Sequence, residues 1–249
     1  MFFSKIKILI SFVVILVIII GLLLYINTTI SNLFAAVFGS IVASIIVSSV
    51  YNEELHIAMN KYKKIGLKNY FDNFEDVQNE IRIKISKAKK VDIYVMYGDR
   101  FFNTSSKALN SLLAKENTAL RCFIYSKSNK FIEAYGNYWG DEQNDSEYSE
   151  TGIKNKLDNV LKLISRFNEK KNKLSTIELY QIQSAPISNS FYIIDDELYF
   201  VPNKNLKSKE IKPAVFHFKK TNDETTMYSK IKNDLTVMIA NNEVIKIDL

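Results

Sequence analysis

The stretch Val91-Asp92-Ile93-Tyr94-Val95-Met96-Tyr97 is a compact run of β-branched and aromatic residues that ends at Gly98. Such residues favour a strand, and glycine often ends one. Apolar residues recur at helical spacing over 77–88, after a capping residue at Asp72 or Asn73. A helix from about residue 105 and a second apolar strand at 119–125 follow. Helices that alternate with apolar strands predict an α/β sheet with a parallel core.

The rest of the chain continues this alternation. The spacing predicts a helix over 153–167, four strands at 177–182, 191–194, 198–201 and 214–218, and a last helix over 223–240. Segment 244–249 fits either an edge strand or a docked tail. Segment 135–151 holds Trp139 and five acids, but their spacing matches no calcium loop, so we expect a solvated, mobile loop there.

Two uncharged apolar segments, 8–26 and 33–51, precede this domain. A helix of that length covers about 28 Å, the thickness of a bilayer core. The six-residue connection, 27–32, suits two antiparallel spans, so the pattern predicts a transmembrane hairpin. A cleaved signal peptide is the alternative for the first segment, but the apolar run is too long and no convincing cleavage site follows.

The expected fold class is therefore α/β, with an N-terminal transmembrane helical hairpin followed by one cytosolic mixed α/β domain. Its expected parts are a hairpin at 1–51, a juxtamembrane helical linker at 52–68 and the α/β domain at 69–249. Lysines on both sides of the hairpin predict a cell inner membrane protein with both termini cytosolic. The single cysteine, Cys122, fits a reducing compartment.

The second apolar segment carries small residues at a spacing of four, among them Gly39, Ser40, Ser44 and Ser48. Small residues at that spacing let two helices approach closely. Packing against another helix is one interpretation. The other is that the serines line a water-filled path, which requires several copies around an axis.

Several kinds of chemistry lack the residues that they need. The chain has no glycine-rich phosphate loop, no cysteine cluster, and two histidines, His56 and His217. We therefore expect no metal and no cofactor, and we expect His217 to be a half-exposed strand residue.

The formal net charge of +6 is dispersed along the chain. It is compatible with binding to anionic lipid or to a phosphate-bearing ligand, and such a charge is also common in proteins that bind neither.

The segment 188–201, Ser-Asn-Ser-Phe-Tyr-Ile-Ile-Asp-Asp-Glu-Leu-Tyr-Phe-Val, reads as two strands around a doubled Asp turn. Together with 88–93, 120–124 and 177–180, it resembles the phospholipase D-like family, whose signature is His-x-Lys-x4-Asp. Aligned on Asp195, the His position holds Ser188 and the Lys position holds Ser190. In that family the His is the nucleophile and the Lys neutralises phosphate charge, so the resemblance implies a degenerate domain without catalytic residues.

The resemblance implies that the domain keeps a site shaped for a phosphodiester although the catalytic residues are replaced. The candidate ligand-binding residues are Tyr97, Arg100, Ser188, Ser190, Asp195, Asn203 and Lys204. Polar groups that converge at strand ends in α/β sheets are common ligand contacts.

The leading functional hypothesis is a membrane-anchored effector, by analogy antiphage. Its cytosolic domain would sense a nucleotide or single-stranded oligonucleotide and control an oligomeric transmembrane pore or ion channel. The expected partners are the lipid bilayer, further copies of the chain, and a nucleotidyltransferase-type protein that makes the ligand. The alternatives are a membrane-tethered nuclease or phosphodiesterase and a non-catalytic membrane scaffold.

Overall fold

The computed structural model describes residues 64–140, 147–186, 189–202 and 212–249, together with residues 21, 39–44, 47–48, 51, 57 and 60–62. The chain divides into two compact units, Met1–Lys61 and Tyr62–Leu249. The described residues of the first unit are helical, and the second unit contains the α/β domain.

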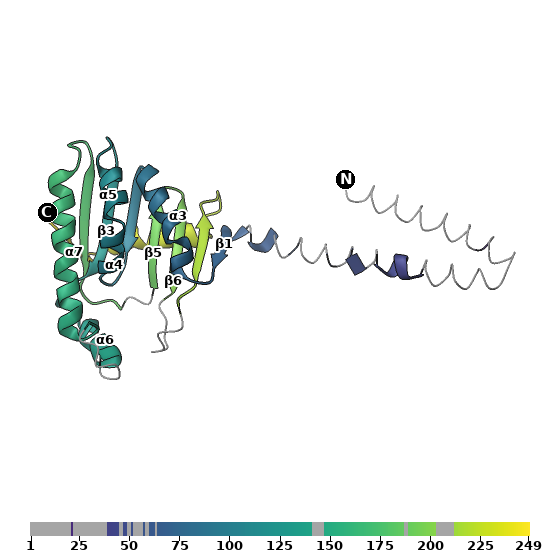
Figure 1. Ribbon diagram of the computed structural model, residues 1–249, viewed down its shortest axis with the longest axis horizontal. Coiled ribbons are helices and arrows are strands. Elements are labelled where there is room, and N and C mark those ends of the chain that lie inside the picture. The colour runs from purple at the N-terminus through teal and green to yellow at the C-terminus, as the bar shows by residue number, and fades with distance from the viewer. Residues whose placement is uncertain are drawn as a thin grey trace. The chain divides into compact units, whose positions relative to one another are not determined.

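The second unit is built on one eight-stranded sheet (Figure 1), so the expectation of a mixed α/β domain is confirmed. The strand order is β1-β7-β6-β5-β2-β3-β4-β8. β2, β3 and β4 are parallel, as predicted, and every other neighbouring pair is antiparallel. The strands are β1 Leu67–Phe71, β2 Lys90–Tyr94, β3 Ala119–Tyr125, β4 Thr176–Ile182, β5 Asn189–Ile194, β6 Glu197–Pro202, β7 Val215–Lys219 and β8 Val244–Ile247.

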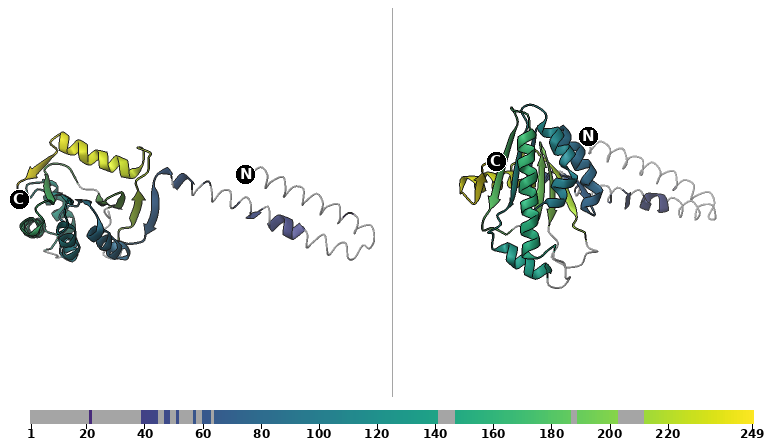
Figure 2. Two further views of the ribbon diagram at one scale, coloured as in Figure 1. Left: turned by 90° about the horizontal axis from the view of Figure 1, so that it is seen from above. Right: turned by 60° about the vertical axis from the view of Figure 1, so that its left-hand side comes forward.

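Helices cover both faces of this sheet. In Figure 2, α8 lies on one face of the sheet, and α3, α5 and α7 lie on the other. The helices are α3 Phe74–Lys87, α4 Asp99–Thr104, α5 Ser106–Leu113, α6 Phe131–Gly140, α7 Glu150–Lys170 and α8 Met227–Ala240. Side-chain caps start three of them: Asn73 accepts from the Asp76 amide, Ser149 from Gly152 and Thr226 from Ser229.

The core lies between the sheet and its helices, where the apolar stripes of α3, α5 and α7 are fully buried. Val77, Ile81 and Ile85 of α3 have no exposed surface, which is the helical spacing that the sequence indicates. The side chains of β2 and β3 that face these helices are apolar, whereas Asp92 and Arg121 lie on the opposite face, toward α8.

Three local predictions are corrected. Residues 67–71 form the edge strand β1, which the sequence pattern did not reveal. Residues 135–140 belong to helix α6 rather than to a solvated loop, and Trp139 is buried. His217 is 1% exposed rather than half-exposed, because the Tyr199 ring stacks on it and Glu197 lies 3.1 Å from its Nε2. Segment 244–247 is an edge strand, which decides between the two alternatives for the C-terminus.

The membrane part of the expected fold class is also corrected. Among the residues that the structure describes, none of the helices combines the length and the apolar character needed to cross a bilayer. The structure thus does not show the predicted transmembrane hairpin; much of 8–26 and 33–51 lies outside the described residues. The fold class that the structure supports is mixed α/β with an eight-stranded sheet, and the membrane and ion-channel expectations lose their basis with the hairpin.

Candidate functional site

The carboxyl ends of β2, β3 and β4 share one edge of the sheet, called here the carboxyl edge; the opposite edge is the amino edge. β5 is antiparallel to β2, and its last paired residue at the carboxyl edge is Phe191, opposite Tyr94. Ser190 is the next residue toward that edge, and the segment after Tyr94 leads to Tyr97. The structure therefore brings the candidate residues Ser190, Tyr97 and Arg100 to one edge.

An aromatic triangle defines the corner in which Ser190 lies. Side chains alternate along a strand, so Ser190 is on the same face as Tyr192. The Tyr192 ring lies 4.4 Å from that of Phe101 in α4 and 5.5 Å from that of Phe74 in α3, measured between centroids. Ser190 therefore faces the amino-terminal turns of α3 and α4.

Two cations meet at this corner on one carboxylate. The Lys212 ammonium lies 2.6 Å from one oxygen of Glu75, and the Arg100 guanidinium lies 3.7 Å from the other. Hydrogen bonding and charge from Lys212 lower the pKa of Glu75. Two cations share this single carboxylate, and the Arg100 side chain is 80% exposed, so its guanidinium can reach a ligand in solution.

Tyr97 links this corner to α7 through Lys156. The Lys156 ammonium lies 5.1 Å from the Tyr97 ring centroid and 4.4 Å from that of Tyr148, which are cation–π distances. Burial raises the pKa of the Tyr97 hydroxyl, so it stays protonated and can donate a hydrogen bond at neutral pH.

Asp195 lies at the amino edge, away from Ser190. It occupies the two-residue turn between β5 and β6 with a φ of 50°, in the left-handed region that Asp tolerates. Its carboxylate accepts the backbone amides of Lys89 and Lys90 at 3.0 and 2.9 Å. The turn thus ties β5 to the start of β2. The other three candidates, Ser188, Asn203 and Lys204, lie outside the described residues.

Gly39, Ser40, Ser44 and Ser48 are exposed helical residues of the first unit. The Ser44 hydroxyl donates to the Ser40 carbonyl oxygen at 2.7 Å, a local bond within one helix.

A second polar cluster joins α3 to β6 and β7, and the sequence pattern did not suggest it. The imidazole Nε2 of His217 lies 3.1 Å from Glu197, and the His217 ring stacks on Tyr199 at 4.2 Å. The Tyr199 hydroxyl donates to Glu80 at 2.8 Å. Desolvation would raise the pKa of Glu197, but hydrogen bonds from Lys84 and Lys68 lower it to about 2.

This cluster does not fit a divalent metal, although ligand atoms of Glu80, Glu197 and His217 lie within 4.8 Å of one another. Lys84 pairs with Glu197 and lies 3.0 Å from Glu80, so its ammonium holds the position that a cation would take. Lys68 pairs with Glu197 at 2.9 Å. Each carboxylate is already matched by an ammonium, as in an internal ion-pair network.

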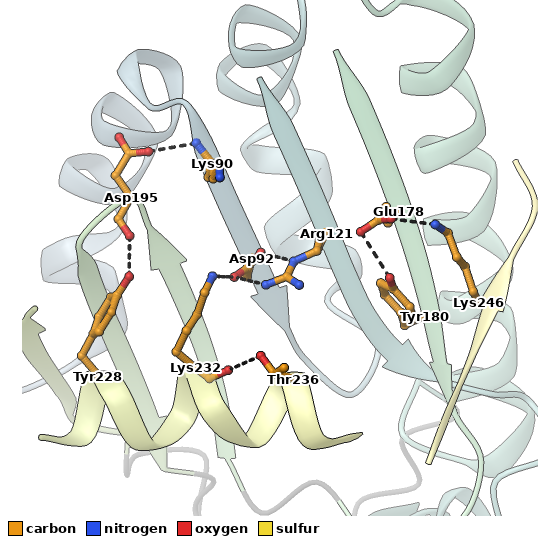
Figure 3. A network of polar contacts seen from close by, with 10 residues as sticks. All are labelled: Lys90, Asp92, Arg121, Glu178, Tyr180, Asp195, Tyr228, Lys232, Thr236 and Lys246. Atoms are coloured by element: carbon orange, nitrogen blue, oxygen red, sulfur yellow. Dashed lines mark hydrogen bonds and ion pairs between the residues drawn. The ribbon is translucent and has the colours of Figure 1, made fainter. Parts of the chain in front are cut away.

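A third network holds α8 against the sheet (Figure 3). Asp92 is 3% exposed and accepts two hydrogen bonds from Arg121, at 2.7 and 2.8 Å, and one from Lys232 of α8 at 2.5 Å. Tyr228 donates to the carbonyl oxygen of Asp195 at 2.8 Å. Asp92 and Arg121 occupy matching positions in the two parallel strands. Opposite charges at matching positions of neighbouring strands favour an ion pair, and this pattern in the sequence could have predicted the contact.

Comparisons with known proteins add little to this geometry. No protein-family model matches the chain, and no curated protein matches it. Among solved structures, one similar chain is TrmBL2, an archaeal chromatin protein whose structure is described as showing a novel mode of DNA binding. The two share 8% identity at a TM-score of 0.41, over 88% of this chain and 70% of that one.

Proposed function

We propose that this chain contains a non-catalytic sensor domain that binds a nucleotide or a short single-stranded oligonucleotide at the carboxyl edge. The observation that carries the proposal is the corner where Arg100 and Lys212 share Glu75, at the same edge of the sheet as Ser190. It offers an exposed guanidinium, a lysine ammonium and a hydroxyl, which together suit one phosphate group.

The residue at the Lys position of the phospholipase D-like signature supports a non-catalytic domain. Ser190 stands where the resemblance to phospholipase D-like domains places the phosphate-neutralising Lys. Without an activating base serine is a weak nucleophile, and its neutral hydroxyl cannot neutralise phosphate charge. The carboxylate of Asp195 is engaged with two backbone amides at the other edge.

The test is binding of ATP, and of a labelled single strand of about ten nucleotides, to the full-length chain at low salt; strands of that length match usual site sizes. Arg100→Gln removes a charge-assisted phosphate contact, which contributes about 1.5–3 kcal/mol, so the affinity should fall about 10- to 100-fold. Arg166→Gln, on the exposed side of α7, is the matched control and should bind like the unchanged protein.

Two results would contradict the proposal. One is that the unchanged protein binds neither probe at low salt, and the other is that both arginine variants bind equally well. Cleavage of the labelled strand by purified protein would instead support the alternative of a nuclease.

A further inference from the structure

A cluster of lysines lies at the amino edge, opposite the corner described above. Three connections meet there: 87–90 leads from α3 into β2, 114–118 from α5 into β3, and 171–175 from α7 into β4. Together they contain six lysines and one acid. The lysines are Lys87, Lys89, Lys90, Lys115, Lys171 and Lys173, named here the amino-edge lysine patch, and the acid is Glu116.

Hydrogen bonds hold the three connections together. Lys115 donates to the Ala88 carbonyl oxygen at 2.6 Å, and the Asn172 amide donates to Leu113 at 2.8 Å. The buried hydroxyls of Thr118 and Ser175 lie 2.9 Å apart. The patch is therefore a built surface on a fixed backbone rather than a set of independent loops.

The charge of the patch exceeds what the fold itself requires. Helices α3, α5 and α7 all end at this edge, and lysines are commonly found at helix carboxyl ends because the helix dipole is negative there. Three helix ends supply about −1.5 elementary charges. The patch has a formal excess of five positive charges, or four when the bordering Asp195 is included. A surplus of about 2.5 charges remains after the dipoles are counted.

This surplus is available to a partner. None of the six lysines forms an ion pair with any residue that the structure describes. Lys87, Lys89, Lys90 and Lys173 are exposed. In contrast, Lys127, Lys154 and Lys246, elsewhere on the domain, each have an acidic partner.

We propose that the amino-edge lysine patch binds the phosphate backbone of a nucleic acid duplex, without reading its sequence. Lysine acts as a point charge toward phosphate, and the patch contains no arginine to make the bidentate contacts that read guanine. From β2 to β4 the sheet advances two strand spacings, about 10 Å. Along the axis of a duplex each strand carries one phosphate for about every 3.4 Å, so a length of about 10 Å along that axis holds about three phosphates of one strand.

The test is the salt dependence of duplex binding by the full-length chain. Three phosphate contacts predict a slope of about −3 for the logarithm of the binding constant against that of the salt concentration. The variant Lys89→Gln/Lys171→Gln/Lys173→Gln should weaken binding at low salt, and the slope should shrink by about one unit for each lysine that contacts a phosphate. The side chains of these three lysines form no hydrogen bond or ion pair with the described residues, so the variant should keep its melting temperature.

The matched control is Lys107→Gln/Lys162→Gln/Lys230→Gln, which removes the same charge from exposed positions on α5, α7 and α8. Equal weakening by both triple variants would show an effect of net charge only and overturn the proposal. So would failure of the unchanged protein to bind duplex at low salt. Binding to phosphatidylserine vesicles but not to DNA, lost in the patch variant, would overturn it in favour of a lipid surface. Arg100→Gln should leave duplex binding unchanged, which separates this proposal from the carboxyl-edge site.

Discussion

Asp92 is a buried charge whose partners come from β3 and α8. Desolvation would raise its pKa, but hydrogen bonds and charge from Arg121 and Lys232 hold the pKa below its usual value. Asp92→Asn would remove the buried carboxylate that both cations pair with. The free energy of unfolding should therefore fall by about 3 kcal/mol, measured by urea denaturation. The control is Asp158→Asn, which breaks the exposed pair with Lys127 and should cost about 0.5 kcal/mol or less; equal losses would contradict the prediction.

Protonation of His217 should make the free energy of unfolding depend on pH. Burial lowers its pKa, partly opposed by Glu197, so below about pH 6.5 the unfolded chain binds more protons than the folded one. The stability that His217 contributes is present above that pH and is lost as the pH falls through the folded-state pKa. The urea midpoint should fall between about pH 7.5 and 5.5, and it should fall less in His217→Gln. An identical fall in both proteins would exclude His217 as the cause.

At the scale of elements, the contact between α6 and α7 depends on Gly136. A Cβ atom at this position would lie 2.6 Å from the backbone nitrogen of Glu150 and 3.1 Å from its Cα, and backbone atoms cannot move aside cheaply. Gly136→Ala should cost about 1–3 kcal/mol despite the higher helix propensity of alanine. Trp139, the single tryptophan, lies in the same helix, so its fluorescence should report the shift of α6. Asn137→Ala, on the exposed side of α6, should leave both stability and fluorescence unchanged; an equal change there would contradict the steric explanation.

The same scale shows which elements the sequence could predict. α7 was predicted because Ile153, Leu157, Val160, Ile164 and Phe167 repeat at helical spacing, and all five are buried. β1 was missed because only its two ends are partly buried, and an edge strand between polar neighbours has no alternating apolar pattern. α6 was missed because its aromatic residues adjoin five acids, whose charge resembles that of a loop.

Across the whole molecule, the parallel strands separate two kinds of surface. The carboxyl edge gathers Tyr97, Arg100 and Ser190, as their places after β2 and at the start of β5 predict. The amino edge gathers the lysine patch and Asp195. The sequence placed Asp195 with the serines because the signature motif contains all three, but five residues of extended strand separate Ser190 from Asp195 by about 17 Å. Arg100→Gln and the triple lysine variant therefore test two distinct surfaces.

The α/β character of the domain, its parallel centre and most of its helices followed from the sequence alone, because hydrophobic periodicity is a local property that each segment carries. The contacts between distant segments were decided by tertiary structure. The sharing of Glu75 by Arg100 and Lys212, the cluster around Glu197 and His217, and the meeting of three lysine-bearing connections all depend on strand order and register. These determine which residues far apart in the chain become neighbours, and no local pattern encodes them.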